Sequence, residues 1–180
     1  MESAHLWYVA YGSNLAATRL QEYLDGCRVC DAPAEARATR IPHELLFAHH
    51  STRWGGGPAF VDPDVDADAG TMATAWLLAR SQFLDVLAME NGAPIGSLDE
   101  VALPSRPGET ALAAGGRYGL VVAVPSPDER PAYTFTTAER PLPPRTRPGP
   151  DYVAVIVSGL VAHHGLSDRE AREYLGRRGA

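Results

Sequence analysis

A short apolar run that breaks abruptly at a glycine constrains this chain more than any other feature. Residues 6–11 are apolar or aromatic, Gly12-Ser13-Asn14 follows, and a helical pattern then runs from Leu15 to Leu24. The run predicts a buried strand, and Ser13 or Asn14 is a candidate N-cap of the helix. A strand, a glycine turn and a helix start aim backbone N–H groups at one point, where the helix dipole adds positive charge. This turn therefore predicts a site for a carboxylate or phosphate.

The length and charge of the chain limit its class and its partners. A chain of 180 residues is expected to form a single domain, 1–180, with a proper core. The net charge of −6 gives no support to nucleic-acid or membrane binding, and no apolar run approaches the ~20 residues of a membrane span. Met1-Glu2-Ser3 lacks the basic start of a secretory signal, so we expect a cytoplasmic protein.

Residue types that carry cofactor or metal chemistry are sparse. All 16 basic residues are arginine, which excludes Schiff-base lysines, pyridoxal phosphate chemistry and the P-loop. Cys27 and Cys30 lie in a predicted strand start, where residues three apart face opposite sides, so we expect two unpaired thiols. The acidic segment 62–70 misses the glycine and glutamate positions of a calcium loop. We expect no metal and no cofactor, but a zinc site built from distant histidines and aspartates stays open.

The order of the predicted elements indicates the fold class. Helices are expected after Leu15, from Ser81 to Glu90 with a left-handed stop at Gly92, and from the capping box at Ser167 to Leu175. Residues 152–163 could form a strand or a buried helix. Strands are expected at residues 6–11, 29–34, 44–48, 58–61, 70–79, 118–124 and 132–136. Because the strands come in runs, the pattern predicts an α+β fold with a small, mixed, barrel-like, strongly bent sheet and about three helices.

Glu90 is the carboxylate best suited to proton transfer. It ends a predicted helix beside Ala88 and Met89, so both apolar surroundings and the helix C-terminus should raise its pKa. A carboxyl group tuned toward neutral pH can act as a general acid and base, although a solvent-exposed glutamate is the commoner case. Arg53, Arg145 and Arg147 could meet anionic substrate groups, or could be solvated surface residues.

Four motifs in series make the chain similar to the gamma-glutamylcyclotransferase family, across most of residues 7–175. They are Tyr8-Val9-Ala10-Tyr11-Gly12-Ser13-Asn14-Leu15, Trp54-Gly55-Gly56-Gly57-Pro58-Ala59, the helix bearing Glu90, and Pro150-Asp151-Tyr152 with an apolar segment ending in His164-Gly165-Leu166. The resemblance implies a small mixed α/β barrel that needs no metal or cofactor. The chain departs from the family pattern at Asn91, where glycine is expected directly after the glutamate, and in the long loop 93–116. That loop could reshape the pocket for the leaving group.

The resemblance also implies an activity and a set of site residues. The family releases an amine from a γ-glutamyl compound by cyclising the γ-glutamyl group to 5-oxoproline. Glu90 matches the catalytic glutamate, Tyr8 to Ser13 match the segment that cradles the γ-glutamyl group, and Tyr152 matches a tyrosine of the substrate pocket. Tyr118 and Tyr133 are weaker matches to pocket tyrosines. A monomer and a homodimer are both compatible with the sequence.

The chemistry of the residues agrees with this activity, because the substrate carries its own nucleophile. A well-oriented intramolecular attack by the α-amine can supply roughly 7–11 kcal/mol, and one carboxyl group can move the protons. Two alternatives stay open, a non-catalytic module that binds γ-glutamyl ligands and a metal-dependent amide hydrolase or deacetylase. The sequence does not indicate which amine is released.

Overall fold

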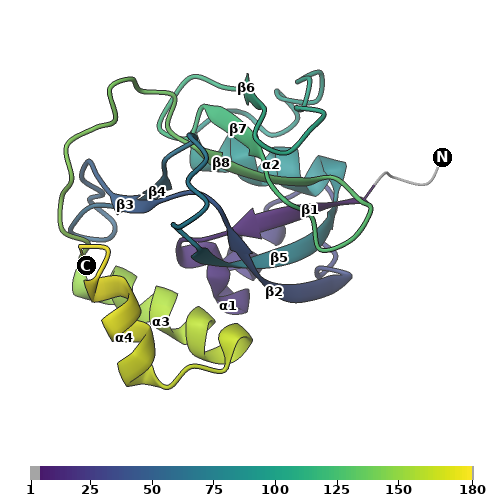
Figure 1. The fold of residues 1–180 in the computed structure, drawn as a ribbon. Coiled ribbons are helices and arrows are strands. Elements are labelled where there is room, and N and C mark those ends of the chain that lie inside the picture. The colour runs from purple at the N-terminus through teal and green to yellow at the C-terminus, as the bar shows by residue number, and fades with distance from the viewer. Residues whose placement is uncertain (1–4, 180) are drawn as a thin grey trace.

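The computed structural model describes residues 5–179, so Met1-Glu2-Ser3, on which the expectation about a secretory signal depends, lies outside the described residues. Strands and helices mix along the chain (Figure 1). The elements are β1 (His5–Ala10), η1 (Ser13–Leu15), α1 (Ala17–Leu24), β2 (Glu35–Ile41), β3 (Leu45–Phe47), β4 (Ala59–Val61), β5 (Thr71–Ala79), α2 (Arg80–Glu90), β6 (Thr110–Leu112), β7 (Leu120–Ala123), β8 (Ala132–Thr136), α3 (Pro150–His164) and α4 (Asp168–Gly176).

Six of these strands form one mixed sheet in the order β2-β5-β1-β8-β7-β6, and β3 and β4 pair in a separate two-stranded sheet. Strand β1 pairs antiparallel with β5 and parallel with β8, so it lies in the interior of the larger sheet. This architecture confirms the predicted α+β class. The described residues contain four α-helices rather than about three, because the ambiguous segment 152–163 is helical.

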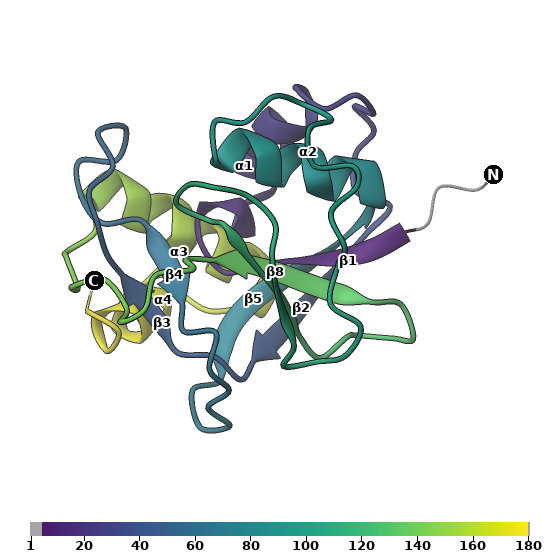
Figure 2. The same cartoon turned by 90° about the horizontal axis from the view of Figure 1, so that it is seen from above.

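Strand β1 is buried on both faces, which explains its unbroken apolar sequence. Trp7, Val9 and Tyr11 pack in a core with residues of α3 and α4. Leu6, Tyr8 and Ala10 point the other way, into a core with residues of α1 and α2. Figure 2 shows α1 and α2 together on one side of the strands and α3 and α4 on another. The C-terminal end of β1 therefore lies where both helical layers meet the sheet.

Local sequence signals set most of the helix ends. Gly92 adopts a φ of 64° after α2, as predicted, and Gly165 ends α3 in the same left-handed conformation. Ser167 and Glu170 form the predicted capping box of α4. Pro150 stands in the first turn of α3, where its missing N–H costs no helical hydrogen bond.

One predicted strand is wrong. Residues 29–34 are irregular, and the neighbouring strand β2 begins only at Glu35. Pro33 cannot donate to a strand ladder, and the carbonyl groups of Val29 and Asp31 accept hydrogen bonds from the Gln82 side chain instead. Cys27 and Cys30 thus lie in a loop after α1, the first buried and the second exposed.

None of the helices within residues 5–179 is long and apolar enough to cross a membrane.

Candidate active site

The turn after β1 differs in detail from its prediction. Ser13–Leu15 form a short 3₁₀ turn, and α1 begins only at Ala17 after the extended residue Ala16. Neither Ser13 nor Asn14 caps a helix through its side chain, so that expectation is wrong. The Trp76 indole N–H donates to the Asn14 carbonyl oxygen over 2.9 Å, which fixes the turn against β5.

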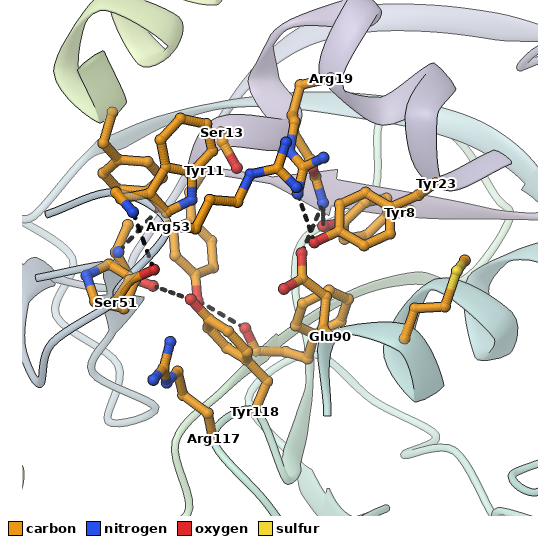
Figure 3. A pocket seen from close by; sticks show the side chains of 18 residues that line it. Tyr8, Tyr11, Ser13, Arg19, Tyr23, Ser51, Arg53, Glu90, Arg117 and Tyr118 are labelled. Atoms are coloured by element: carbon orange, nitrogen blue, oxygen red, sulfur yellow. Dashed lines mark hydrogen bonds between the residues drawn. The ribbon is translucent and has the colours of Figure 1, made fainter. Parts of the chain in front are cut away.

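Asn14 joins the turn to the end of α2. Its side-chain nitrogen donates to the Tyr8 hydroxyl at 3.0 Å and to Oε1 of Glu90 at 3.2 Å. Tyr8 comes from β1 and Glu90 is the last residue of α2, so one amide links three elements. Figure 3 shows Glu90 and Tyr8 facing the same cavity.

The environment of Glu90 favours its protonated form. Burial raises the pKa of its carboxyl group above the ordinary value, although a hydrogen bond from Tyr23, the positive charge of Arg19, the Asn14 amide and the charge of Arg117 all lower it. The side chain is only partly exposed. Burial dominates because an ionised carboxylate loses more hydration here than these groups replace. The site therefore holds a carboxyl group suited to exchange protons nearer neutral pH.

Most of the candidate site residues identified in the sequence line one cavity of about 220 Å³. Its lining includes Tyr8, Tyr11, Gly12, Ser13, Asn14, Glu90, Tyr118 and Tyr152. Val9 and Ala10 are not in the lining, because their side chains lie in the two cores on either side of β1. Tyr133 is not in the lining either, and its hydroxyl donates to the Pro104 carbonyl at 3.0 Å instead.

Two tyrosines hold the wall formed by Ala59. The Ala59 N–H donates to the Tyr152 hydroxyl at 3.1 Å, and the Tyr118 hydroxyl donates to the Ala59 carbonyl at 3.1 Å. Burial raises the pKa of Tyr152 to about 12, so its hydroxyl stays protonated at neutral pH. A Cβ atom on Gly12 would lie 2.9 Å from the Tyr152 oxygen, so any larger residue at this position would force the turn or the Tyr152 side chain to shift.

The glycine-rich segment after Trp54 packs without space against the segment that leads into α3. A Cβ atom on Gly149 would lie 1.8 Å from the Trp54 carbonyl oxygen, and one on Gly56 would lie 2.4 Å from the Gly149 nitrogen. This contact places the rings of Trp54 and Tyr152 with centroids 5.0 Å apart. Gly56 of the second motif and Gly149 thus act by allowing backbone contact, whereas Gly55 has open space at its Cβ position and a φ of 63°.

The cavity is also lined by residues that the sequence does not identify as candidates, among them Arg19, Tyr23 and Arg117. Arg19 donates to the Tyr23 hydroxyl at 2.9 Å, and the two residues stand four apart on one face of α1. The spacing of four residues in the sequence could have predicted that Arg19 and Tyr23 lie side by side on a helix. No pattern in the sequence predicts that Arg117 lies in the same cavity. Arg53 lines the cavity as one of three nominated arginines.

The other two nominated arginines lie outside the cavity lining. Arg145 pairs with Glu44 at 2.6 Å, and both Arg145 and Arg147 have exposed side chains. Within residues 5–179, no three histidine, cysteine, aspartate or glutamate side chains are grouped so that they could hold a metal ion.

Sequence comparison relates the chain to one protein of known name. No protein-family model matches the chain. The chain is 29% identical over 201 residues to Histone deacetylase 5 of Arabidopsis thaliana, in an alignment that covers 94% of this chain and spans only 30% of the length of that protein.

Solved structures give a more direct likeness. A gamma-glutamyl cyclotransferase superposes with a TM-score of 0.58 at 19% identity, covering 94% of this chain and 85% of its own. An uncharacterized protein from Homo sapiens gives 0.58 at 18% identity, with the same two shares covered. YkqA from Bacillus subtilis gives 0.55 at 17% identity, covering 98% of this chain and 55% of its own. The chain has the gamma-glutamyl cyclotransferase fold, as the resemblance predicts.

Proposed function

We propose that this chain is a γ-glutamyl cyclotransferase that cleaves a γ-glutamyl amide into 5-oxoproline and a free amine. The observation that carries the proposal is the contact between Asn14 and Glu90, which puts the turn after β1 and a partly buried carboxyl group in one cavity. The likeness to a solved gamma-glutamyl cyclotransferase supports the same activity.

The proposed reaction is an intramolecular acyl transfer. The α-amine nitrogen of the substrate attacks the γ-carbonyl carbon, a new C–N bond closes the five-membered ring, and the original amide C–N bond breaks. Glu90 accepts one proton from the α-ammonium group before the attack and a second from the ring nitrogen after it, and it passes each to the departing nitrogen, which leaves as an ammonium group. No water is consumed, so the site needs only to fold the substrate and move the proton.

The remaining residues of the cavity are proposed to bind different parts of the substrate. In this proposal the backbone N–H groups of residues 12–14, which lie in the turn before α1, hold the α-carboxylate of the γ-glutamyl group. Tyr8 and Tyr11 form the adjoining wall, and the Tyr11 hydroxyl is already bonded to the Phe135 carbonyl at 2.7 Å. Tyr118 and Tyr152 close the opposite wall through Ala59.

Assays with γ-glutamyl amino acids and γ-glutamyl amines test the proposal. The wild-type protein should release 5-oxoproline, and Glu90→Gln should lower turnover by about 10²- to 10⁴-fold. Glu100→Gln is the matched control, because Glu100 is exposed and lies outside the cavity lining. Full turnover by Glu90→Gln would overturn the assigned role of Glu90.

The same assay separates the alternatives. A non-catalytic module would bind γ-glutamyl ligands and release nothing, whereas an amide hydrolase would release glutamate in place of 5-oxoproline. The deacetylase alternative left open by the sequence shares its name with one relative, but the chain spans only 30% of the length of that relative. No group of metal-ligating side chains within residues 5–179 supports it.

A further inference from the structure

Strand β6 forms one of the two outer edges of the larger sheet (Figure 1). It pairs antiparallel with β7, and no strand of residues 5–179 lies on its other side. The Glu109 carbonyl accepts from an N–H of β7 at 3.0 Å, and the Ala113 N–H donates to a carbonyl just before β7 at 2.8 Å. Because backbone groups alternate in direction along a strand, the N–H and C=O groups of Thr110 and Leu112 point away from β7. This edge therefore offers two donors and two acceptors to another strand.

The two edges of the sheet differ in charge. The opposite edge, β2, carries Glu35, Arg37 and Arg40, and Arg37 pairs with Glu35 at 2.6 Å. Charged side chains on an edge strand disfavour pairing with a second chain. Strand β6 has the sequence Thr-Ala-Leu and carries no charge. Of the two edges, β6 is thus the one open to pairing.

Exposed apolar side chains lie beside this edge. In the part of the chain that the structure describes, Leu112 and Val65 are the most exposed large apolar residues, at 75% and 60%. Leu112 lines a hollow of about 370 Å³ together with Thr110 and Leu120. A Cβ atom on Gly108 would lie 3.6 Å from Val65 Cγ2, so Val65 lies near the start of β6. Apolar side chains gathered at an unpaired edge are typical of an interaction surface.

We propose that β6 is the interface of a homodimer, in which two copies of the chain pair antiparallel about a two-fold axis at Ala111. This register places Thr110 of each copy opposite Leu112 of the other, so every outward N–H and C=O group of the two strands forms a hydrogen bond. The axis is perpendicular to the sheet, so both hollows lie on one face and the two Leu112 side chains become diagonal neighbours. The contact is isologous and occupies both β6 edges, so assembly stops at two copies.

The charges around the hollow are complementary in this orientation. Asp64 and Arg140 both line it, and the carboxylate nearest to Arg140 within residues 5–179 is Asp62, at 3.9 Å. Asp64 adjoins Val65, near the start of β6. Arg140 follows the end of β8, which lies across β7 from the Leu112 end of β6. Antiparallel pairing brings the start of one strand beside the end of the other, so Asp64 of each copy lies toward Arg140 of the other.

This interface is separate from the proposed active site. The hollow beside β6 and the cavity that contains Glu90 share no lining residue. Four hydrogen bonds and a small apolar contact make a small interface, for which we expect a dimer dissociation constant on the order of micromolar.

Sedimentation equilibrium of the full chain at rising concentration tests the dimer. The wild type should follow a monomer–dimer equilibrium. Leu112→Lys removes the apolar contact and places like charges near the axis, so it should raise the dissociation constant by at least about tenfold. Val161→Lys is the matched control, because Val161 is also exposed and apolar but lies on α3, outside the hollow. A wild type that stays monomeric, or one that forms larger assemblies, would overturn the proposal.

Disulfide cross-linking tests the register. In the proposed dimer the two Ala111 residues form a non-hydrogen-bonded pair with a Cα–Cα distance of about 4.5 Å, which a disulfide can span. Ala111→Cys should therefore link two copies under mild oxidation. The Cys30→Ser background removes the exposed native thiol, and Cys27 is buried. Ala113→Cys, also on a half-buried residue, is the control and should stay unlinked, because the two copies of position 113 lie far apart. Linking through position 113, or none through 111, would refute the two-fold axis at Ala111.

A charge exchange tests the orientation. Asp64→Arg and Arg140→Asp should each weaken the dimer, and the double variant should recover most of the loss, since opposite charges then face each other again. If the double variant is as weak as the single variants, the copies do not meet in this orientation and the proposal is overturned. None of these measurements uses a substrate, so the interface and the proposed cyclotransferase activity stand or fail independently.

Discussion

Asn14 and Glu90 stand 76 residues apart in the chain, yet the Asn14 amide nitrogen lies 3.2 Å from Oε1 of Glu90. The same nitrogen contacts the Tyr8 hydroxyl, so the end of β1 and the end of α2 meet at one side chain. This contact helps to orient a carboxyl group whose pKa is raised by burial. The pKa of the Glu90 carboxyl group therefore depends on the same contacts that fix its position.

The pH dependence of kcat/KM should reflect the raised pKa of Glu90. The carboxylate form is the base, so activity should fall as the pH decreases through that pKa, at a pH above the ~4.3 of an ordinary glutamate. The hydrogen bond from Tyr23 lowers the pKa of Glu90. Tyr23→Phe should therefore move the acid limb of the profile to higher pH.

The matched control for this shift is Tyr133→Phe. The Tyr133 hydroxyl is bonded to Pro104, outside the cavity, so its removal should leave the acid limb in place. A limb that moves to lower pH in Tyr23→Phe would contradict the assigned donor role of Tyr23. A limb that moves equally in both variants would point to a general loss of structure.

The sequence predicted those elements around the cavity that depend on neighbouring residues. The apolar run up to Tyr11, the turn at Gly12 and the helix end at Glu90 are local patterns, and each lies where predicted within a few residues. Arg117 could not be found in this way, because its place in the cavity depends on hydrogen bonds between the Asn91 side chain and the backbone of the neighbouring Tyr118. The position of Tyr133 was equally out of reach of the sequence, because its hydroxyl is bonded to the Pro104 carbonyl of the 93–116 loop and Tyr133 lies outside the cavity lining.

Glu90 should lower the stability of the fold at neutral pH. A carboxyl group whose folded pKa is raised stabilises the protein below its unfolded pKa, and this contribution is lost as the pH rises through the folded pKa. Glu90→Gln should therefore raise Tm at pH 8, by about 2–4 °C for each kcal/mol gained. The gain should shrink toward pH 4, where Glu90 is largely protonated.

Thermal unfolding of Glu90→Gln and of the exposed control Glu100→Gln across this pH range checks the sign. A lower Tm for Glu90→Gln at pH 8, with no change in the control, would show that the ionised Glu90 stabilises the fold. The comparison needs no substrate, so it is independent of the proposed reaction.

The glycine at position 12 should be required for the fit between the turn and Tyr152. Gly12→Ala would bring a Cβ atom to 2.9 Å from the Tyr152 oxygen and 3.4 Å from the Ala59 Cβ. Overpacking of this kind typically costs about 1–3 kcal/mol. Because Tyr152→Phe removes the clashing oxygen, Gly12→Ala should cost less in the Tyr152→Phe background, as measured by denaturant unfolding of the four proteins. Equal costs in both backgrounds would exclude this contact as the cause.

The close approach of α3 to the turn should be equally sensitive to one methyl group. A Cβ atom on Gly159 would lie 2.6 Å from the Leu15 carbonyl carbon and 2.7 Å from the Leu15 Cβ. Gly159→Ala must therefore push α3 away from η1, with an expected loss of about 1–3 kcal/mol in the free energy of unfolding. Since η1 carries Ser13 and Asn14, the variant should also raise KM for every γ-glutamyl substrate.

Gly176→Ala supplies the control, because Gly176 lies in α4 with open space where its Cβ would be. Alanine is the better helix former, and at the last residue of α4 its effect should be small, so this variant should be at least as stable as the wild type and keep its KM. If Gly159→Ala behaved like Gly176→Ala in denaturant unfolding, α3 would not set the position of the turn. A Gly159→Ala protein with unchanged stability but a raised KM would instead show that the turn can move with little loss in the free energy of unfolding. The geometry of the site would then not depend on the stability of the fold.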